Sequence, residues 1–459
     1  MIFNDFAFLF LFLPAVLMLF YAPFLRPYRV ATLTLASFVF YGFSGLEHAL
    51  VLAFDIAWIY LVCRSPRFPG DRVRLAVAII PPILALVYYK YLGFILGSMG
   101  LSPPSGAVGP EAYQGLDILW DVALPAGVSF FTFQVVSYAI DRYRMQVAEP
   151  PPFRRFALYV SFFPQLVAGP IVRFEQVADA LKSLTRFRPS AEQLYTGVVY
   201  IVCGLALKVL LADSLARSLA PFVEAPDNLG LDASLFLIFG YSFQIYFDFY
   251  GYSLAAIGLG LLFGVRLPLN FLRPYEALNP REFWRRWHVT LSYWIRDYLY
   301  RPLGGNERYS RNILIVFAVC GLWHGAGWTF VIWGLYHAVL VAGYRLVRPA
   351  WDALPRALQW AGSFSLVSAG WLLFVFDFSG MQRYAASLGT PGALSASWTD
   401  WAVLLIAAAV CFGPSVEKLA EAPPLSKGRA AALAACGAAL AFATLMFVSV
   451  SDSFIYFRF

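Results

Sequence analysis

The sequence predicts an all-helical protein that crosses a membrane many times. Charged residues make up 13% of the chain and hydrophobic residues 60%, and the mean hydropathy is +0.66. Soluble domains carry about a quarter charged residues. This chain therefore has too little polar surface to cover a soluble globule, whereas a lipid-facing exterior needs none. We expect one integral membrane domain over residues 1–459.

Long apolar runs recur along the chain, and a helix needs about 20 apolar residues to span the bilayer core. The candidate spans are 6–25, 30–45, 46–63, 73–97, 119–141, 194–212, 234–265, 312–345, 357–376, 400–413 and 430–451. The runs 234–265 and 312–345 are long enough that we expect a break, or two helices, in each. Roughly ten to twelve membrane-embedded helices follow.

The loops between these runs alternate in charge. Arginines occupy the first, third and fifth loops, whereas the second and fourth have no Lys or Arg. Because basic short loops stay in the cytoplasm, the N-terminus is predicted to lie outside. The formal charge of +7 is spread over these loops, which favours membrane topology over nucleic-acid binding. The five cysteines include no CxxC pair, so neither a disulfide framework nor a metal site is expected.

The apolar segment 156–172 disturbs this alternation. A full crossing there would place the basic residues that follow it outside the cell. A re-entrant or protein-buried segment avoids that, and Pro164, Gly169 and Pro170 suit a broken path. Irregular backbone at membrane depth is tolerated only where protein or a cavity shields it. The segment therefore indicates a central cavity.

Residues 279–298 predict an amphipathic helix. Asn279 can cap it, Pro280 suits its first position, and Glu282 can close a capping box. Downstream, an apolar aromatic stripe recurs at helical spacing and includes Trp287 and His288. A Trp-anchored interfacial helix would explain the tryptophans but not a histidine on the same stripe.

Two further polar groups lie in apolar runs. His324 is surrounded by glycines in GLWHGAGW, residues 321–328, and Asp248 lies in the aromatic run 244–253. Ionisable groups at membrane depth are costly and usually face a cavity or a partner. Each could be purely structural. For Asp248 we expect an arginine of the basic segment, or a histidine, as its partner.

The chain contains no Walker loop, Rossmann turn or GxSxG elbow, and no carboxylate cluster that marks a metal. One or two buried histidines in a cavity remain. A desolvated imidazole is a suitable general base for a hydroxyl, because its pKa lies near neutrality. Attack of an alcohol on a thioester fits this arrangement.

The ordered motifs resemble those of the membrane-bound O-acyltransferase family, in particular its bacterial alginate O-acetyltransferase type. They are 124–130, 164–170, 246–249, 282–288, 296–300, 303–306, 321–326 and the terminal 454–457. The resemblance implies a helical ring around a funnel or tunnel, with a re-entrant region. It also implies that His324 is the central catalytic residue and that His288 is the second motif histidine. The remaining candidates, which would support catalysis or bind donor or acceptor, are Asp248, Trp287, Arg285, Arg286, Trp323 and Asn306.

The resemblance further implies O-acyl transfer, with acetyl expected, in the cytoplasmic (inner) membrane of a bacterium. The donor would be acetyl-CoA or another acyl thioester, used as a co-substrate without any bound cofactor or metal. The acceptor would be an envelope polysaccharide, reached directly or through an extracytoplasmic SGNH-type partner. D-alanyl transfer to teichoic acid, acylation of a small molecule or lipid, and a proton-coupled transporter remain as alternatives. No internal repeat supports the transporter.

Overall fold

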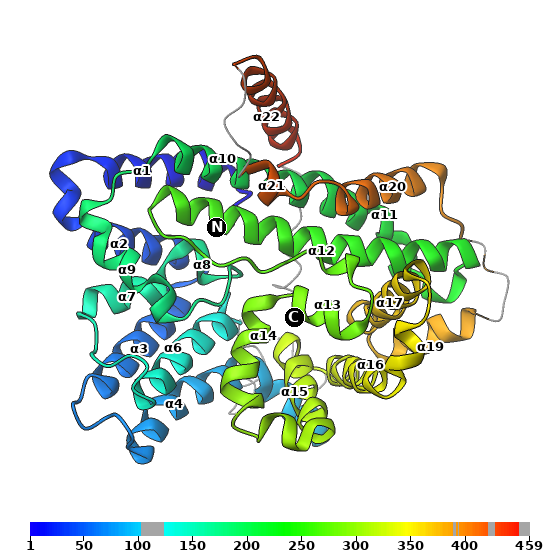
Figure 1. Cartoon of the computed structure of the whole chain (residues 1–459), viewed down its shortest axis with the longest axis horizontal. Helices are drawn as coiled ribbons and strands as arrows, with labels where there is room; N and C mark the ends of the chain where they lie inside the picture. The colour runs from blue at the N-terminus through cyan, green and yellow to red at the C-terminus, as the bar shows by residue number, and fades with distance from the viewer. Residues whose placement is uncertain (102–123, 389–391, 393, 421–426, 449–459) are drawn as a thin grey trace, which may run out of the picture. The chain divides into compact units, whose positions relative to one another are not determined.

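The computed structural model describes residues 1–101, 124–388, 392, 394–420 and 427–448 (Figure 1). Within these residues the chain is helical, and the one β-type contact is an isolated bridge between Leu229 and Leu394. The helices form two compact units, residues 13–187 and residues 2–12 with 188–459. The all-helical prediction is confirmed, whereas a single domain over 1–459 stays a prediction. The terminal motif 454–457 lies outside the described residues.

The first unit contains short and long helices in sequence. They are α1 (Leu13–Tyr21), η2 (Pro23–Tyr28), α2 (Arg29–Gly42), α3 (Leu46–Cys63), α4 (Arg72–Leu86), η3 (Val87–Tyr91), α5 (Leu92–Ser98), α6 (Val128–Tyr143), α7 (Phe153–Ser161), α8 (Phe163–Leu166), α9 (Phe174–Ser183) and η5 (Leu184–Arg186). The segment 156–172 is buried and broken as predicted, with helix in two short pieces and irregular backbone from Val167.

Two of the motifs pack together in this unit. Gly127 lies against the backbone of the second motif, because a Cβ added there would meet the Leu166 carbonyl oxygen at 2.6 Å. The Tyr41 hydroxyl donates to the Ala126 carbonyl at 2.8 Å, and the Gln165 amide donates to the Tyr159 carbonyl at 2.6 Å. Side chains thus satisfy part of the irregular backbone, as burial at membrane depth requires.

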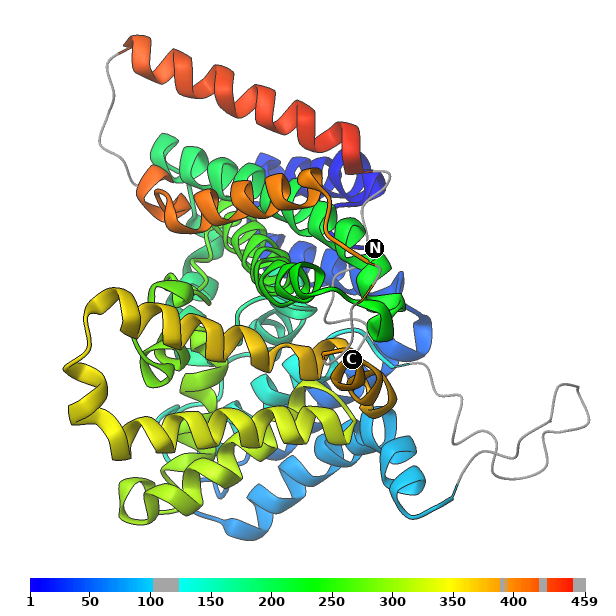
Figure 2. The ribbon, with the colours of Figure 1, turned by 90° about the vertical axis from the view of Figure 1, so that its right-hand side faces the viewer.

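The second unit carries the histidine motifs. Its elements are η1 (Ala7–Phe12), α10 (Ala191–Ala206), η6 (Leu207–Ala212), α11 (Asp213–Glu224), η7 (Pro226–Asn228), α12 (Leu231–Leu262), η8 (Pro274–Glu276), α13 (Pro280–Arg286), α14 (Val289–Ile295), η9 (Arg296–Tyr300), η10 (Gly305–Arg308), α15 (Tyr309–His324), α16 (Trp328–Asp352), α17 (Arg356–Gly370), α18 (Leu372–Val375), α19 (Phe378–Ser387), α20 (Trp398–Phe412), α21 (Val416–Ala420) and α22 (Lys427–Phe447). Figure 2 shows α16 and α17 as an antiparallel pair joined by a short turn.

Six helical stretches among the described residues are long and apolar enough to cross a membrane. They are Leu46–Cys63, Arg72–Ser98, Ala191–Glu224, Leu231–Leu262, Trp328–Asp352 and Arg356–Val375, and the bent pair Ala7–Tyr21 and Pro23–Gly42 would be a seventh. The chain is therefore a multi-pass membrane protein. The predicted total of roughly ten to twelve embedded helices also counted shorter apolar runs, such as the one that forms Trp398–Phe412, and stays a prediction.

The two long runs behave differently from each other. The run 312–345 holds two helices, with a break at Gly325–Gly327, as predicted. The run 234–265 does not break, because α12 is one continuous helix of 32 residues. Its apolar window is entirely buried in the protein. A helix that is hydrophobic on all sides suits such an environment, so its length reflects burial rather than a second span.

Candidate functional site

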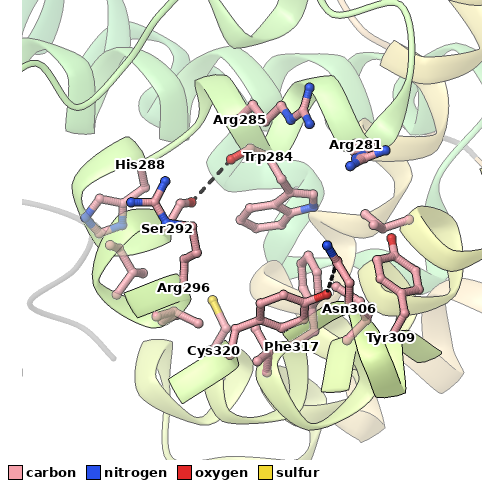
Figure 3. Close-up of a pocket in the computed structure, with 16 residues that line it drawn as sticks. Arg281, Trp284, Arg285, His288, Ser292, Arg296, Asn306, Tyr309, Phe317 and Cys320 are labelled. Atoms are coloured by element: carbon pink, nitrogen blue, oxygen red, sulfur yellow. Dashed lines mark hydrogen bonds between the residues drawn. The ribbon is translucent and has the colours of Figure 1, made fainter. Parts of the chain in front are cut away.

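A cavity of about 240 Å³ lies between the segment 281–300 and helices α15 and α16 (Figure 3). Its polar wall contains three arginines, His288, Ser292 and Asn306, and its remaining wall is aromatic or aliphatic apart from Cys320. The lining is Arg281, Trp284, Arg285, His288, Leu291, Ser292, Ile295, Arg296, Tyr300, Asn306, Tyr309, Ile313, Val316, Phe317, Cys320 and Val341. All of these residues belong to the second unit.

Helix α13 begins as the sequence predicted. The Asn279 side-chain oxygen accepts from the Glu282 amide at 2.8 Å, which satisfies one of the exposed donors at a helix start. The Glu282 carboxylate reaches back to the amide of Leu278 at 2.9 Å, one residue earlier than a standard capping box. Glu282 also pairs with Arg286. These contacts fix the first turn of the segment that carries His288.

The predicted continuous helix over 279–298 is wrong. Helix α13 ends at Arg286, and a second helix, α14, begins at Val289. Between them His288 adopts a left-handed conformation with φ of +42°. Tertiary contacts hold this turn, because the Val289 amide donates to the Asn270 carbonyl at 2.9 Å and the Thr290 hydroxyl donates to the Asn270 side chain at 2.6 Å. Such uncommon backbone often marks a functional position.

The turn directs His288 against other aromatic rings. Its ring centroid lies 4.7 Å from that of Phe249, 5.6 Å from that of Trp323 and 6.3 Å from that of His324. Burial lowers the pKa of His288 to about 3, since desolvation disfavours the charged imidazolium. The imidazole is therefore neutral at physiological pH, the form that accepts a proton.

His324 is the last residue of α15 and is 2% exposed. Its ring packs against Trp333 at 5.2 Å and Phe374 at 5.5 Å. Helices α15 and α16 approach closely beneath it, because a Cβ added to Gly321 would lie 2.1 Å from the Phe330 carbonyl oxygen. A Cβ added to Gly334 would likewise meet the Phe317 carbonyl oxygen at 2.0 Å. The glycines around His324 thus allow the helix contact that places it.

The two predicted catalytic histidines therefore lie together, although they are 36 positions apart in the chain. His288 lines the cavity, and within the described residues His324 is not part of that lining. Trp323 contacts both rings, at 5.6 Å from His288 and 4.9 Å from His324. The two rings are neighbours, with 6.3 Å between their centroids, and of the two histidines only His288 belongs to the lining described.

The predicted arginines separate. Arg285 lines the cavity with Arg281, and both are exposed. In the part of the chain that the structure describes, neither forms a salt bridge with a carboxylate. Arg286 is not in the cavity lining described and is paired with Glu282. Arg296 lines the cavity but pairs with Asp297 at 2.8 Å. Arg281 and Arg285 are therefore the cations that can meet an incoming anion.

Of two other predicted residues, one lines the cavity and the other packs in the protein interior. Asn306 lines the cavity and accepts a hydrogen bond from the Tyr300 hydroxyl at 2.8 Å (Figure 3). Trp287 is fully buried, and its ring lies 5.0 Å from both Phe271 and Trp371, where it supports the His288 turn.

The prediction for Asp248 is wrong in its partner. Asp248 pairs with a residue that was not predicted, Lys208, the Nζ to Oδ1 distance being 2.8 Å. Lys208 lies in the apolar run 194–212, where a single lysine was itself a signal of a buried ion pair.

Sequence reasoning missed several cavity residues, and helical spacing could have found two of them. Cys320 and Phe317 precede His324 by four and seven positions, which places them on the same face of α15. Trp284 lines the cavity, and its ring packs at 5.1 Å against that of Phe317. Among the residues that the structure describes, no group of three His, Cys, Asp or Glu side chains could hold a metal ion.

Comparison with known proteins finds matches over this region and most of the chain. A model of the membrane-bound O-acyltransferase family matches residues 118–376, which include both histidines and the whole cavity lining. A probable alginate O-acetylase of Azotobacter vinelandii is 37% identical over 386 residues, 82% of this chain and 75% of that protein. A peptidoglycan O-acetyltransferase of Helicobacter pylori is 34% identical over 378 residues, 74% of this chain and 70% of that protein. A teichoic acid D-alanyltransferase of Bacillus subtilis is 32% identical over 230 residues, 48% of this chain and 58% of that protein.

Proposed function

The chain belongs to the membrane-bound O-acyltransferase family, and from this premise we propose that it moves an acetyl group from a cytoplasmic thioester to a hydroxyl of a cell-envelope polysaccharide. O-acyltransferase activity follows from the family and from O-acetyltransferase relatives over most of the chain. The observation that carries the finer proposal is the histidine pair at the wall of an arginine-lined cavity.

The donor is an acyl thioester with a phosphorylated carrier, such as acetyl-CoA. Arg281 and Arg285 are exposed and have no carboxylate partner among the described residues, so they suit phosphate oxygens. The aliphatic and aromatic side of the cavity includes Val316, Phe317 and Val341. It suits the part of the donor that links the phosphates to the thioester, because that part carries few polar groups. The donor acts as a co-substrate, and no bound cofactor is required.

His324 acts as the general base in this proposal, and His288 orients the donor. His324 removes the proton from the acceptor hydroxyl, the oxygen attacks the thioester carbonyl carbon, and the carbon–sulfur bond breaks. The thiol leaves with a proton, so atoms and charge balance. Positioned general bases contribute about 10²–10⁴-fold to such reactions. The assignment is supported by the cavity wall, where His288 faces the donor space and His324 lies behind it.

The acceptor reaches the site from the other face of the membrane. We propose the inner membrane of a bacterium as the location, with the N-terminus extracytoplasmic, because basic residues concentrate in alternate loops. The acetyl group passes to the polysaccharide directly or through an extracytoplasmic SGNH-type partner. Alginate and peptidoglycan, named for two relatives, define the class of acceptor.

Mass spectrometry of envelope polymers tests this proposal. Cells with the gene, cells without it, and cells that express His324→Ala are compared. Gain of acetyl esters that depends on the gene and on His324 is expected. D-alanyl esters instead would favour teichoic acid as acceptor, as in the Bacillus subtilis relative. Unchanged polymers together with proton-coupled uptake of a solute would show a transporter and overturn the proposal.

A further inference from the structure

A buried ion cluster lies away from the cavity lining in the second unit. Lys208 Nζ lies 2.5 Å from Asp213 Oδ1 and 2.8 Å from Asp248 Oδ1. The three residues are only 1–3% exposed. Burying charges is costly even when they are paired, and replacing such a cluster with apolar residues is often neutral or stabilising. Its presence in a membrane-embedded core therefore points to a role other than stability.

The two carboxylates differ in what they connect. Asp213 begins α11, five positions after Lys208, so the first contact is local in the chain. Asp248 lies on α12, so the second contact joins two packed helical elements. Lys208 itself lies in a π-helical segment, η6, and such segments occur frequently at functional sites. The interhelical contact, not the local one, fixes α12 against this segment.

Close backbone packing beside the ion pair makes its geometry sensitive to small shifts. A Cβ added to Gly204 would lie 2.5 Å from the Gly251 carbonyl oxygen, and one added to Gly251 would lie 2.5 Å from that of Gly204. Gly251 is three positions after Asp248, about one turn along α12. Helices α10 and α12 are thus in direct backbone contact, and the ion pair sets their register at that contact.

The residue that follows Asp248 connects this register to the site. Phe249 packs edge-on against His288, with 4.7 Å between ring centroids. It also packs at 5.1 Å against Phe271, which lies 5.0 Å from Trp287. His288 is held in a left-handed backbone conformation, so its ring position depends on such neighbours. A shift of α12 would therefore move the surface against which His288 rests.

We infer that Lys208 is a positioning residue for His288, acting through its ion pair with Asp248 and through the Phe249 ring. The inference rests on the proposed function for its effect on turnover. None of the three cluster residues belongs to the cavity lining described, and the inferred action is mechanical, through the Phe249 ring. Asp213 is not required, since its contact with Lys208 does not reach α12.

The test compares full-length variants in nanodiscs supplied with a polysaccharide acceptor, with thiol release from acetyl-CoA as the assay. Lys208→Met and Asp248→Asn are expected to lower kcat per folded enzyme on the order of 10- to 100-fold, since misplacement by about 1 Å costs that much. KM for the donor should stay within about threefold, because the cavity arginines are untouched. Lys208→Arg should recover part of the loss. Asp213→Asn is the matched control and should retain kcat, because it leaves the interhelical pair intact.

A second readout does not depend on turnover. Nitrogen-15 spectra of histidine-labelled protein, assigned with single His→Gln variants, report the environment of His288. Lys208→Met and Asp248→Asn should shift the His288 signal, and Asp213→Asn should not. A normal kcat, an unshifted His288 signal, or equal effects in all three variants would overturn the inference. Absence of turnover in the wild type would instead overturn the proposed function, and the spectra would still decide the positioning role.

Discussion

Replacing Gly321 with alanine is expected to displace His324 by forcing α15 and α16 apart. The added Cβ would lie 2.1 Å from the Phe330 carbonyl oxygen, whereas ordinary van der Waals contact begins at 3.4 Å. The obstacle is backbone, so no flexible side chain can move away. The helices must therefore separate by roughly 1 Å, and overpacking of this kind costs about 1–3 kcal/mol. His324 is three positions farther along the same helix and must shift with it.

The assay is thiol release from acetyl-CoA by purified protein in liposomes supplied with a polysaccharide acceptor, normalised to folded protein by size-exclusion chromatography. Displacement of about 1 Å should lower turnover on the order of 100-fold. Gly343→Ala is the matched control, because it lies in α16 and has no atom within 4 Å of an added Cβ. Alanine favours the helix by about 1 kcal/mol there, so Gly343→Ala should fold and turn over normally. Normal turnover by folded Gly321→Ala would refute the reasoning.

Two further predictions concern the cavity. Arg285→Ala should raise KM for acetyl-CoA about 10- to 100-fold with little change in kcat, because one charge-assisted contact to phosphate is worth about 1.5–3 kcal/mol. Steady-state kinetics over several salt concentrations checks this, and a fall in kcat alone would contradict it. Folding stability should fall as the pH drops below about 6.5, because unfolded His288 takes up a proton there whereas burial lowers its pKa to about 3 in the folded state. The slope should approach 1.4 kcal/mol per pH unit for this one group. His288→Gln should flatten the slope, measured as the thermal unfolding midpoint against pH, and an unchanged slope would refute the burial argument.

Composition and the lengths of the apolar runs predicted the helical class and the break within 312–345, and the alternation of basic loops predicted the buried, broken segment 156–172. They failed at His288, where the apolar periodicity continued through a turn that tertiary contacts, among them those with Asn270, stabilise. They also failed at α12, whose length reflects its burial in the protein. Neither the contacts at the His288 turn nor the burial of α12 can be read from the spacing of apolar residues within those segments.

The residues of the candidate site were predicted in part. His288, Arg285 and Asn306 line the cavity, and His324 packs behind it. Arg286 is also an arginine and directly follows Arg285 in the chain. It lies four positions after Glu282 on the helix, however, and it pairs with that carboxylate. The Asp248 partner was missed, because Lys208 lies in another helical segment 40 positions away, although a single lysine in an apolar run indicated a buried ion pair. Pairing across helices is a property of packing, not of sequence neighbours.

The most direct test of the central claim is transfer of radiolabelled acetyl from acetyl-CoA by purified protein in liposomes supplied with a polysaccharide acceptor. The wild type and His48→Gln, which removes a buried imidazole in the first unit, should both transfer label. His324→Ala, shown to be folded by size-exclusion chromatography, should transfer label about 10²–10⁴-fold more slowly. Transfer by His324→Ala at the wild-type rate would contradict the assignment of His324 as the catalytic base.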